Sequence, residues 1–172
     1  FFGTVLLESD QPIVAIVNQE AVTASGAQAG TYNGAAVAEG SQKISVPLIQ
    51  SDFFGYYTSL TIMTVDGTQA DLNITYTSDE VFSANPGQSK TYNVSTNANG
   101  FINRYEGPGS VNADLLDDDF WLGTNLMGSE WHGFIGSAVI EVTSGSNIVA
   151  FVNSEKSVDG MDSMYTYNAF AQ

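Results

Sequence analysis

A segment near the start of this chain returns near its end, and this duplication constrains the fold more than any other feature. Residues 13–18 read IVAIVN, and residues 148–153 read IVAFVN. The offset is 148 − 13 = 135 residues, and residues 13–36 match residues 148–171 at 10 of 24 positions without a gap. Self-similarity at a fixed period is typical of arrays built from one structural unit.

The match extends to both sides of these two segments. Thr31-Tyr32-Asn33 returns at the same offset as Thr166-Tyr167-Asn168. Upstream, the match continues with a two-residue shift, which places Phe2-Gly3-Thr4 on Ile135-Gly136-Ser137 and Glu8 on Glu141. The chain therefore contains one repeat unit and the tail of a preceding one, which predicts two parts: residues 1–42, a surplus copy of the closing strands, and residues 43–172, the unit itself.

The spacing of apolar and turn residues predicts strands almost throughout. Residues 57–65 alternate between two faces, as a half-buried strand does, and Asp66-Gly67 then predicts a hairpin turn. Pro47 cannot donate a ladder hydrogen bond, so the strand over residues 44–49 is expected at an edge or a bulge. The one helical candidate is Val111 to Trp121, capped by Asn112 or Asp114. Further strands are expected at residues 5–7, 13–17, 70–76, 90–94, 138–142, 148–152 and 164–170.

Gly and Pro punctuate these strands at the spacing of a sandwich. The predicted fold is all-β, an antiparallel β-sandwich of immunoglobulin-like or jelly-roll-like kind with a duplicated terminal strand segment. The surplus copy in residues 1–42 is expected either to complete a pseudo-symmetric sandwich or to contact the next subunit.

Composition excludes several classes of partner. Four Lys plus Arg face 19 Asp plus Glu, so the net charge is −15. Such a surface repels phosphate backbones and anionic lipid headgroups, so we expect binding neither to nucleic acid nor to a membrane surface. No window is apolar for long enough to span a bilayer, so we expect no membrane insertion. There is no Cys, which excludes disulfides and thiolate metal sites. With 43% hydrophobic residues the chain is long and apolar enough to fold around a core.

No group of residues indicates catalysis, and we do not expect an enzyme. His132 is the only histidine, and no Ser lies in a Gly-x-Ser-x-Gly elbow. Glu106, Glu130 and Glu141 offer the two acids that glycoside hydrolysis needs, but any acidic β protein does so. The aromatic residues at 53–57, 121 and 131 are expected in the core or in contacts rather than in a sugar-stacking platform.

Two kinds of modification or ligand are conceivable. Asn73-Ile74-Thr75 and Asn93-Val94-Ser95 satisfy the N-glycosylation sequon, and Asn73 should point away from its apolar neighbours into solvent. No cofactor is expected, with one possible exception, Ca²⁺ bound by carboxylate oxygens. The candidate ligands are Asp114, Asp117, Asp118 and Asp119. The alternative is that these residues form an acidic loop that is solvated and binds no metal.

Four segments in this order carry a resemblance to a known family: residues 10–18 (DQPIVAIVN), 31–34 (TYNG), 46–49 (VPLI) and 133–138 (GFIGSA). The chain resembles the β-sandwich repeat of large secreted surface proteins of filamentous, often thermophilic bacteria. The resemblance implies surface display, tandem arrangement and a structural or adhesive role, and it brings no catalytic residues.

The sequence therefore predicts an extracellular, cell-surface structural subunit that self-assembles head-to-tail with copies of itself into a filament, a pilus-like fibre or a surface layer. The alternative is a carbohydrate-binding or adhesive module of a larger surface protein, with glycans as partners. Assembly would proceed by donation of strands from residues 1–42, whose exposed edge is ready to pair with another chain. The apolar residues expected to carry it are Val5, Leu7, Ile13, Val14, Ile16 and Val17.

Overall fold

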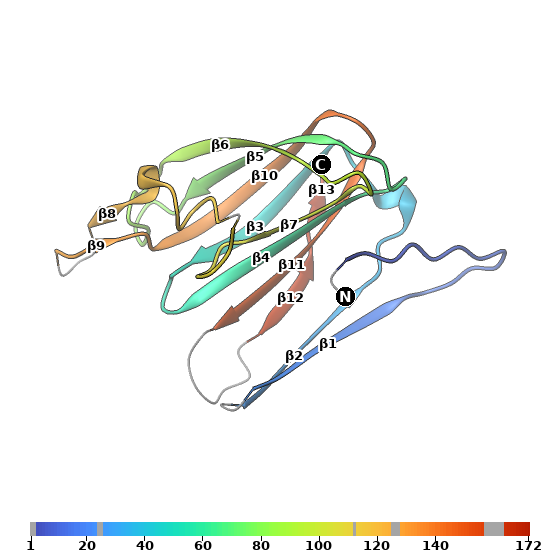
Figure 1. Ribbon diagram of the computed structural model, residues 1–172, viewed down its shortest axis with the longest axis horizontal. Helices are drawn as coiled ribbons and strands as arrows, with labels where there is room; N and C mark the ends of the chain where they lie inside the picture. Colours follow the sequence, from blue (N-terminus) through green and yellow to red (C-terminus); the bar gives the residue numbers. More distant parts are fainter. Residues whose placement is uncertain (1–2, 24–25, 112, 125–127, 157–163) are drawn as a thin grey trace.

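The protein is built almost entirely of β-strands (Figure 1). The computed structural model describes residues 3–23, 26–111, 113–124, 128–156 and 164–172. Two antiparallel sheets pack against each other, and a separate hairpin of β1 (Ile16–Thr23) and β2 (Gly26–Asn33) lies outside them. The predicted all-β sandwich is confirmed.

The larger sheet has five strands in the order β13-β3-β10-β5-β6, and the smaller has four in the order β12-β11-β4-β7. A two-stranded ribbon, β8 with β9, and two short 3₁₀ turns complete the described elements. The bounds are β3 (Lys43–Ser51), β4 (Tyr56–Thr64), β5 (Asp71–Ser78), β6 (Ser89–Ser95), β7 (Phe101–Tyr105), β8 (Gly123–Thr124), β9 (Glu130–Trp131), β10 (Phe134–Ser144), β11 (Ile148–Lys156), β12 (Tyr165–Asn168), β13 (Phe170–Ala171), η1 (Val37–Glu39) and η2 (Asp119–Trp121).

The core lies between the two sheets, where alternate side chains of each strand face inward. In β4 the buried Leu60 and Ile62 face the core, while Thr61 and Met63 on the other face are partly exposed. Trp121 is also buried in this core, against Phe134 at 4.9 Å between ring centroids. It is therefore a packing residue rather than part of a sugar-stacking platform.

Pro47 lies at a bulge, as its missing N–H predicts. In the pairing of β3 with β10, Ile49 is opposite Gly136 but Val46 is opposite Ala138, so the register shifts across Pro47. The neighbouring Leu48 leaves the ladder as well, and the Tyr167 hydroxyl satisfies both of its backbone groups, at 3.2 Å from the nitrogen and 2.7 Å from the oxygen.

One local prediction is wrong, and the one helical candidate forms no α-helix within the described residues. Asp66-Gly67 forms a turn, with φ +70° at Gly67, but β4 before it and β5 after it belong to different sheets and do not pair. The turn therefore carries the chain across the sandwich rather than closing a hairpin. In the helical candidate Val111 to Trp121 the described residues form the 3₁₀ turn η2, which is capped by the Asp118 side chain. The proposed cap Asn112 lies outside the described residues.

Candidate functional site: the terminal hairpin

The duplicated segment forms the same hairpin twice. We call residues 13–36 the terminal hairpin and residues 148–171 the closing hairpin. In the terminal hairpin β1 and β2 pair Ile16 with Asn33, Val17 with Tyr32 and Asn18 with Thr31. In the closing hairpin β11 and β12 pair the residues 135 positions later: Phe151 with Asn168, Val152 with Tyr167 and Asn153 with Thr166. The duplication in sequence is thus a duplication of backbone register.

The hydrogen bond at the end of each hairpin is duplicated too. The Ala169 N–H donates to the Ala150 oxygen at 2.9 Å, where the chain leaves β12 and crosses to the five-stranded sheet. The Gly34 N–H donates to the Ala15 oxygen at 2.8 Å, and both residues lie 135 positions earlier. The terminal hairpin therefore has the same backbone pairing as the closing hairpin. Unlike the closing hairpin, it is not part of either sheet of the sandwich.

The two copies differ in burial. Ile148 is 0% exposed, while its counterpart Ile13 is 54% exposed. Val152 is 0% exposed, and its counterpart Val17 is 37% exposed. The same apolar positions thus fill a core in one copy and meet solvent in the other. All six residues predicted for assembly are exposed: Val5, Leu7, Ile13, Val14, Ile16 and Val17.

The terminal hairpin rests on the outer face of the four-stranded sheet, beside β12 (Figure 1). The ring of Tyr32 lies 5.0 Å from that of Phe151. The Thr166 hydroxyl donates to the Thr31 backbone oxygen at 2.7 Å, and the Asn168 side-chain amide donates to the Asn33 oxygen at 3.2 Å. Side chains of β12 thus bond backbone oxygens along β2, but the two strands do not form a continuous sheet.

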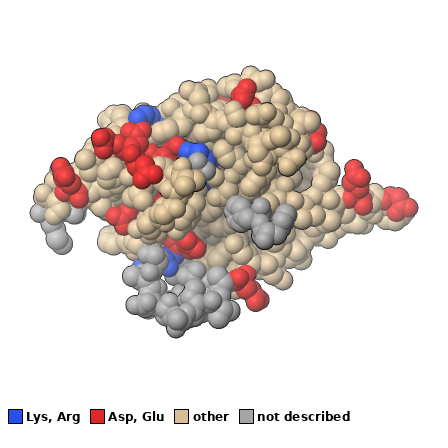
Figure 2. Space-filling model, in the orientation of Figure 1, with Lys and Arg blue, Asp and Glu red and all other residues tan. Residues whose placement is uncertain are grey.

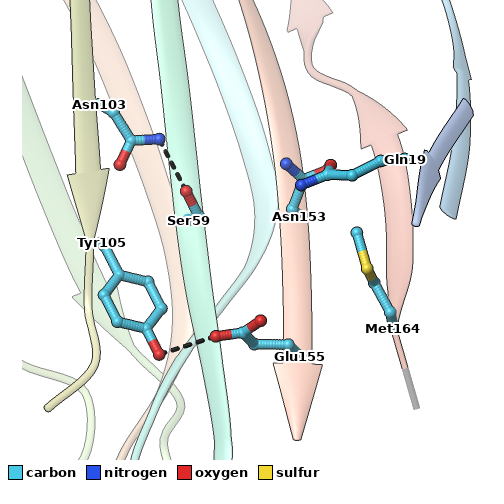
Figure 3. A pocket seen from close by; sticks show the side chains of 7 residues that line it. All are labelled: Gln19, Ser59, Asn103, Tyr105, Asn153, Glu155 and Met164. Carbon is cyan, nitrogen blue, oxygen red and sulfur yellow. Dashed lines mark hydrogen bonds between the residues drawn. The ribbon is translucent and has the colours of Figure 1, made fainter. Parts of the chain in front are cut away.

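A polar pocket of about 300 Å³ lies between the hairpin and this face (Figure 3). The Tyr105 hydroxyl donates to Glu155 Oε1 at 2.8 Å, and its pKa is raised by burial and by that carboxylate. Asn153 Oδ1 is buried without a hydrogen-bond partner. The contact is therefore incompletely packed. The lining residues are Gln19, Ser59, Asn103, Tyr105, Asn153, Glu155 and Met164.

The segment before the terminal hairpin does not form the strands expected of it. Residues 5–7 have no regular secondary structure, and β1 begins at Ile16 rather than at Ile13. A strand needs a neighbour for its backbone groups, and within the described residues none pairs with residues 3–15 beyond the Gly34 bond to Ala15. Val5, Leu6 and Leu7 are consequently exposed.

Two of the four aspartates proposed for Ca²⁺ are engaged by cations of the protein. Asp114 forms an ion pair with Arg104, and Asp118 forms one with Lys90 and accepts from the Tyr92 hydroxyl at 2.7 Å. Within the described part of the chain, no three His, Cys, Asp or Glu side chains are grouped to hold a metal. Calcium binding stays a prediction. Figure 2 shows how far acidic side chains outnumber basic ones on the face drawn.

Glu106 is fully buried, a position that the sequence pattern did not indicate. Tyr76 donates to its Oε1 at 3.0 Å, and the Leu115 N–H donates to its Oε2 at 2.9 Å. Burial, helped by the nearby Asp114, raises the pKa of Glu106 to about 8. Its contacts anchor the acidic loop to the sandwich. Glu130 is exposed and Glu141 pairs with Lys43 at 2.6 Å on the surface, so neither joins it in a carboxylate pair.

The two sequon asparagines lie directly opposite each other on neighbouring strands. Asn73 in β5 pairs with Asn93 in β6, on the outer face of the five-stranded sheet. Leu72 and Ile74 are buried, so the alternation predicted for Asn73 is observed, although Asn73 is half-buried and Asn93 exposed. Glycosylation of either residue stays a prediction.

Comparison with known protein families, with curated proteins and with solved structures finds no match to this chain. In the part of the chain that the structure describes, no helix has the length and apolar character to cross a membrane.

Proposed function

We propose that this chain is an extracellular structural subunit that assembles head-to-tail through its terminal hairpin into a filament or surface layer. One observation carries the proposal: the chain builds the same hairpin twice, and only one copy has a sandwich to close. The resemblance to repeats of secreted bacterial surface proteins is in keeping with it.

The exposed apolar side chains give the driving force. Contiguous exposed apolar surface of this kind marks interaction sites, and its burial stabilises a contact by about 25 cal/mol per Å². In the proposed assembly the terminal hairpin of one copy contacts a different surface of the next copy. A contact of this kind is head-to-tail, and it propagates unless its rotation closes a ring.

A matched pair of exposed valines tests the proposal in the full chain. Val14 on the terminal hairpin is 89% exposed, and Val111 on the acidic loop is 93% exposed. We expect the wild-type chain to associate with rising concentration in analytical ultracentrifugation and to form fibres in electron microscopy. Val14→Asp should weaken this association, whereas Val111→Asp should leave it unchanged. A wild-type chain that stays monomeric at high concentration would contradict the proposal.

The polar pocket favours a second candidate, a carbohydrate-binding module. Its amide and carboxylate groups beside the Tyr105 ring are the groups that bind sugar hydroxyls, and Asn153 Oδ1 still lacks a donor. A glycan array separates the two candidates. Binding that Asn153→Ala and Tyr105→Ala abolish, in a chain that remains monomeric, would favour the module.

A further inference from the structure

We propose that the terminal hairpin takes the place of the closing hairpin in a second copy of this sandwich, with β1 pairing with β4 of that copy in the register that β11 uses here. This inference rests on the proposed function and names its partner, its acceptor strand and its register. In the present chain Phe151 pairs with Thr61 and Val152 pairs with Leu60. Shifted by 135 positions, Ile16 lies opposite Thr61 of the accepting copy, and Val17 lies opposite its Leu60.

The backbone of the terminal hairpin already has the required shape. Its strand register and its corner hydrogen bond repeat those of the closing hairpin, residue for residue. Docking therefore needs no rearrangement within β1 and β2, and the ordering cost that usually opposes strand addition has been met during folding.

The inward side chains fit as well. The closing hairpin presents Ile148, Ala150 and Val152 to the core, and all three are buried. The terminal hairpin carries Ile13, Ala15 and Val17 at the corresponding positions, so the side chains are identical. At these three positions the exchange therefore creates neither a cavity nor an overpacked site. At the next inward position the buried Ser154 corresponds to the larger Gln19, so the exchange repacks that position. Tyr32 corresponds to Tyr167, which bonds both backbone groups of Leu48.

The position of the terminal hairpin within its own chain is a poorer fit. It turns the face that carries Val17 and Tyr32, the face that corresponds to the buried side of the closing hairpin, toward the outer surface of the four-stranded sheet. Ile13 and Val17 remain exposed there, and the polar pocket separates Gln19 from Glu155. The place of a closing hairpin buries the positions that correspond to Ile13 and Val17.

The closing hairpin of the accepting copy must leave β4 before the terminal hairpin enters. This is an exchange of equivalent elements, as in domain swapping. The backbone pairing with β4 and the contacts of the three identical core side chains are replaced by ones of the same kind, whereas the bond of the Tyr165 hydroxyl to Gln50 is lost because its counterpart is Gly30. Because each copy has one terminal hairpin to give and one β4 to offer, repeated exchange joins the copies in one direction.

Cysteine cross-linking in full-length chains tests the register, because the protein has no native Cys. The donor carries Ile16→Cys. The acceptor carries Thr61→Cys, together with Val152→Asp to loosen its own closing hairpin. We expect oxidation of the mixture to give a disulfide between positions 16 and 61, located by mass spectrometry. A matched acceptor carries Met63→Cys, two residues along the same face, and should react at least about fivefold less, because diagonal neighbours are too far apart for a disulfide.

Two further variants keep the result interpretable. Adding Ile13→Asp to the donor should abolish the cross-link, since this residue would enter the core of the acceptor. If Val152→Asp prevents folding, the isotope-labelled acceptor should regain a dispersed NMR spectrum when unlabelled donor is added. Equal reaction at positions 61 and 63, or no reaction while wild-type chains still assemble, would overturn the register but not the proposed function. Cross-linking between positions 16 and 61 in a chain whose wild-type form does not assemble would overturn the proposed function but not the register.

Discussion

The hydroxyl of Thr166 donates a hydrogen bond of 2.7 Å to the backbone oxygen of Thr31, the residue that holds the equivalent position in the other copy of the hairpin. Asn168 and Asn33 are related in the same way. Both contacts join residues 135 positions apart, so β2 and β12 run side by side in the same direction. The duplication is therefore a spatial relationship as well as a sequence match, and several consequences can be measured.

Two valines at equivalent positions should respond differently to the same substitution. Val152 is buried in the core and Val17 is exposed. Val152→Asp buries a charge without a partner and should lower the free energy of unfolding by about 3–5 kcal/mol. Val17→Asp should change it by less than about 1 kcal/mol. Urea unfolding at low protein concentration, where chains do not associate, measures both. Equal losses would mean that the terminal hairpin is an integral part of the sandwich.

The stability of the protein should fall as pH rises through the neutral range because of Glu106. Its pKa is about 8 in the folded state and near 4.5 in the unfolded chain, so the folded state binds the proton more tightly. Its contribution is complete below pH 4.5, decreases by up to about 1.4 kcal/mol per pH unit as pH rises, and is lost above pH 8. Urea unfolding at several pH values should therefore show a slope that Glu106→Gln flattens. The exposed Glu130→Gln is the control and should leave the slope intact.

The ion pair of Arg104 and Asp114 should behave as a buried pair. Both side chains are nearly buried, so Arg104→Met leaves the Asp114 carboxylate without its cation. We expect a loss of about 3–5 kcal/mol in the free energy of unfolding, much of which the double variant with Asp114→Leu should recover. A cost below about 1 kcal/mol for Arg104→Met alone would show that solvent reaches the pair in solution.

Chelation should leave the thermal midpoint unchanged. Lys90 and Arg104 already pair with two of the four aspartates of the acidic loop, which reduces their attraction for Ca²⁺. A bound ion at 100 times its Kd would add about 2.7 kcal/mol, which moves the midpoint by several degrees. Melting with and without a calcium chelator decides between the two outcomes, and a clear drop would establish the metal site.

Assembly should strengthen with salt. Each copy carries a net charge of −15, so copies repel one another on approach. Raising NaCl from about 0.05 M to 0.5 M shortens the screening length and strengthens apolar association relative to repulsion. Ultracentrifugation at both concentrations should give larger species at high salt. Weakening by salt would instead point to an interface held by opposite charges.

Local sequence patterns predicted the secondary structure correctly wherever it depends on the residues of a single strand. Alternation over residues 57–65 predicted β4, and Pro47 predicted the bulge in β3, because each follows from the geometry of a single strand. The hairpin predicted at Asp66-Gly67 was wrong because the residues of a turn do not determine which strands pair. β4 and β5 pair instead with β11 and β10, which lie far along the chain.

The candidate site was predictable only in part, for the same reason. The duplication identified residues 1–42 as surplus, but not that their hairpin would lie on the outer face of the four-stranded sheet. Glu106 appeared as one acidic residue among 19. Its burial depends on Tyr76 and on the loop that carries Leu115, which fold over it from elsewhere in the chain.

By itself the sequence determined the β-strand character of this protein, its acidic surface and the identity of its repeated hairpin, because periodicity, charge and self-similarity are properties of the chain. Only the tertiary structure decided which copy is buried. The residues Ile13 and Ile148 are chemically the same, yet one is exposed and the other is not. The difference arises because burial needs a partner surface, and β4 with its neighbours can accept one hairpin at a time.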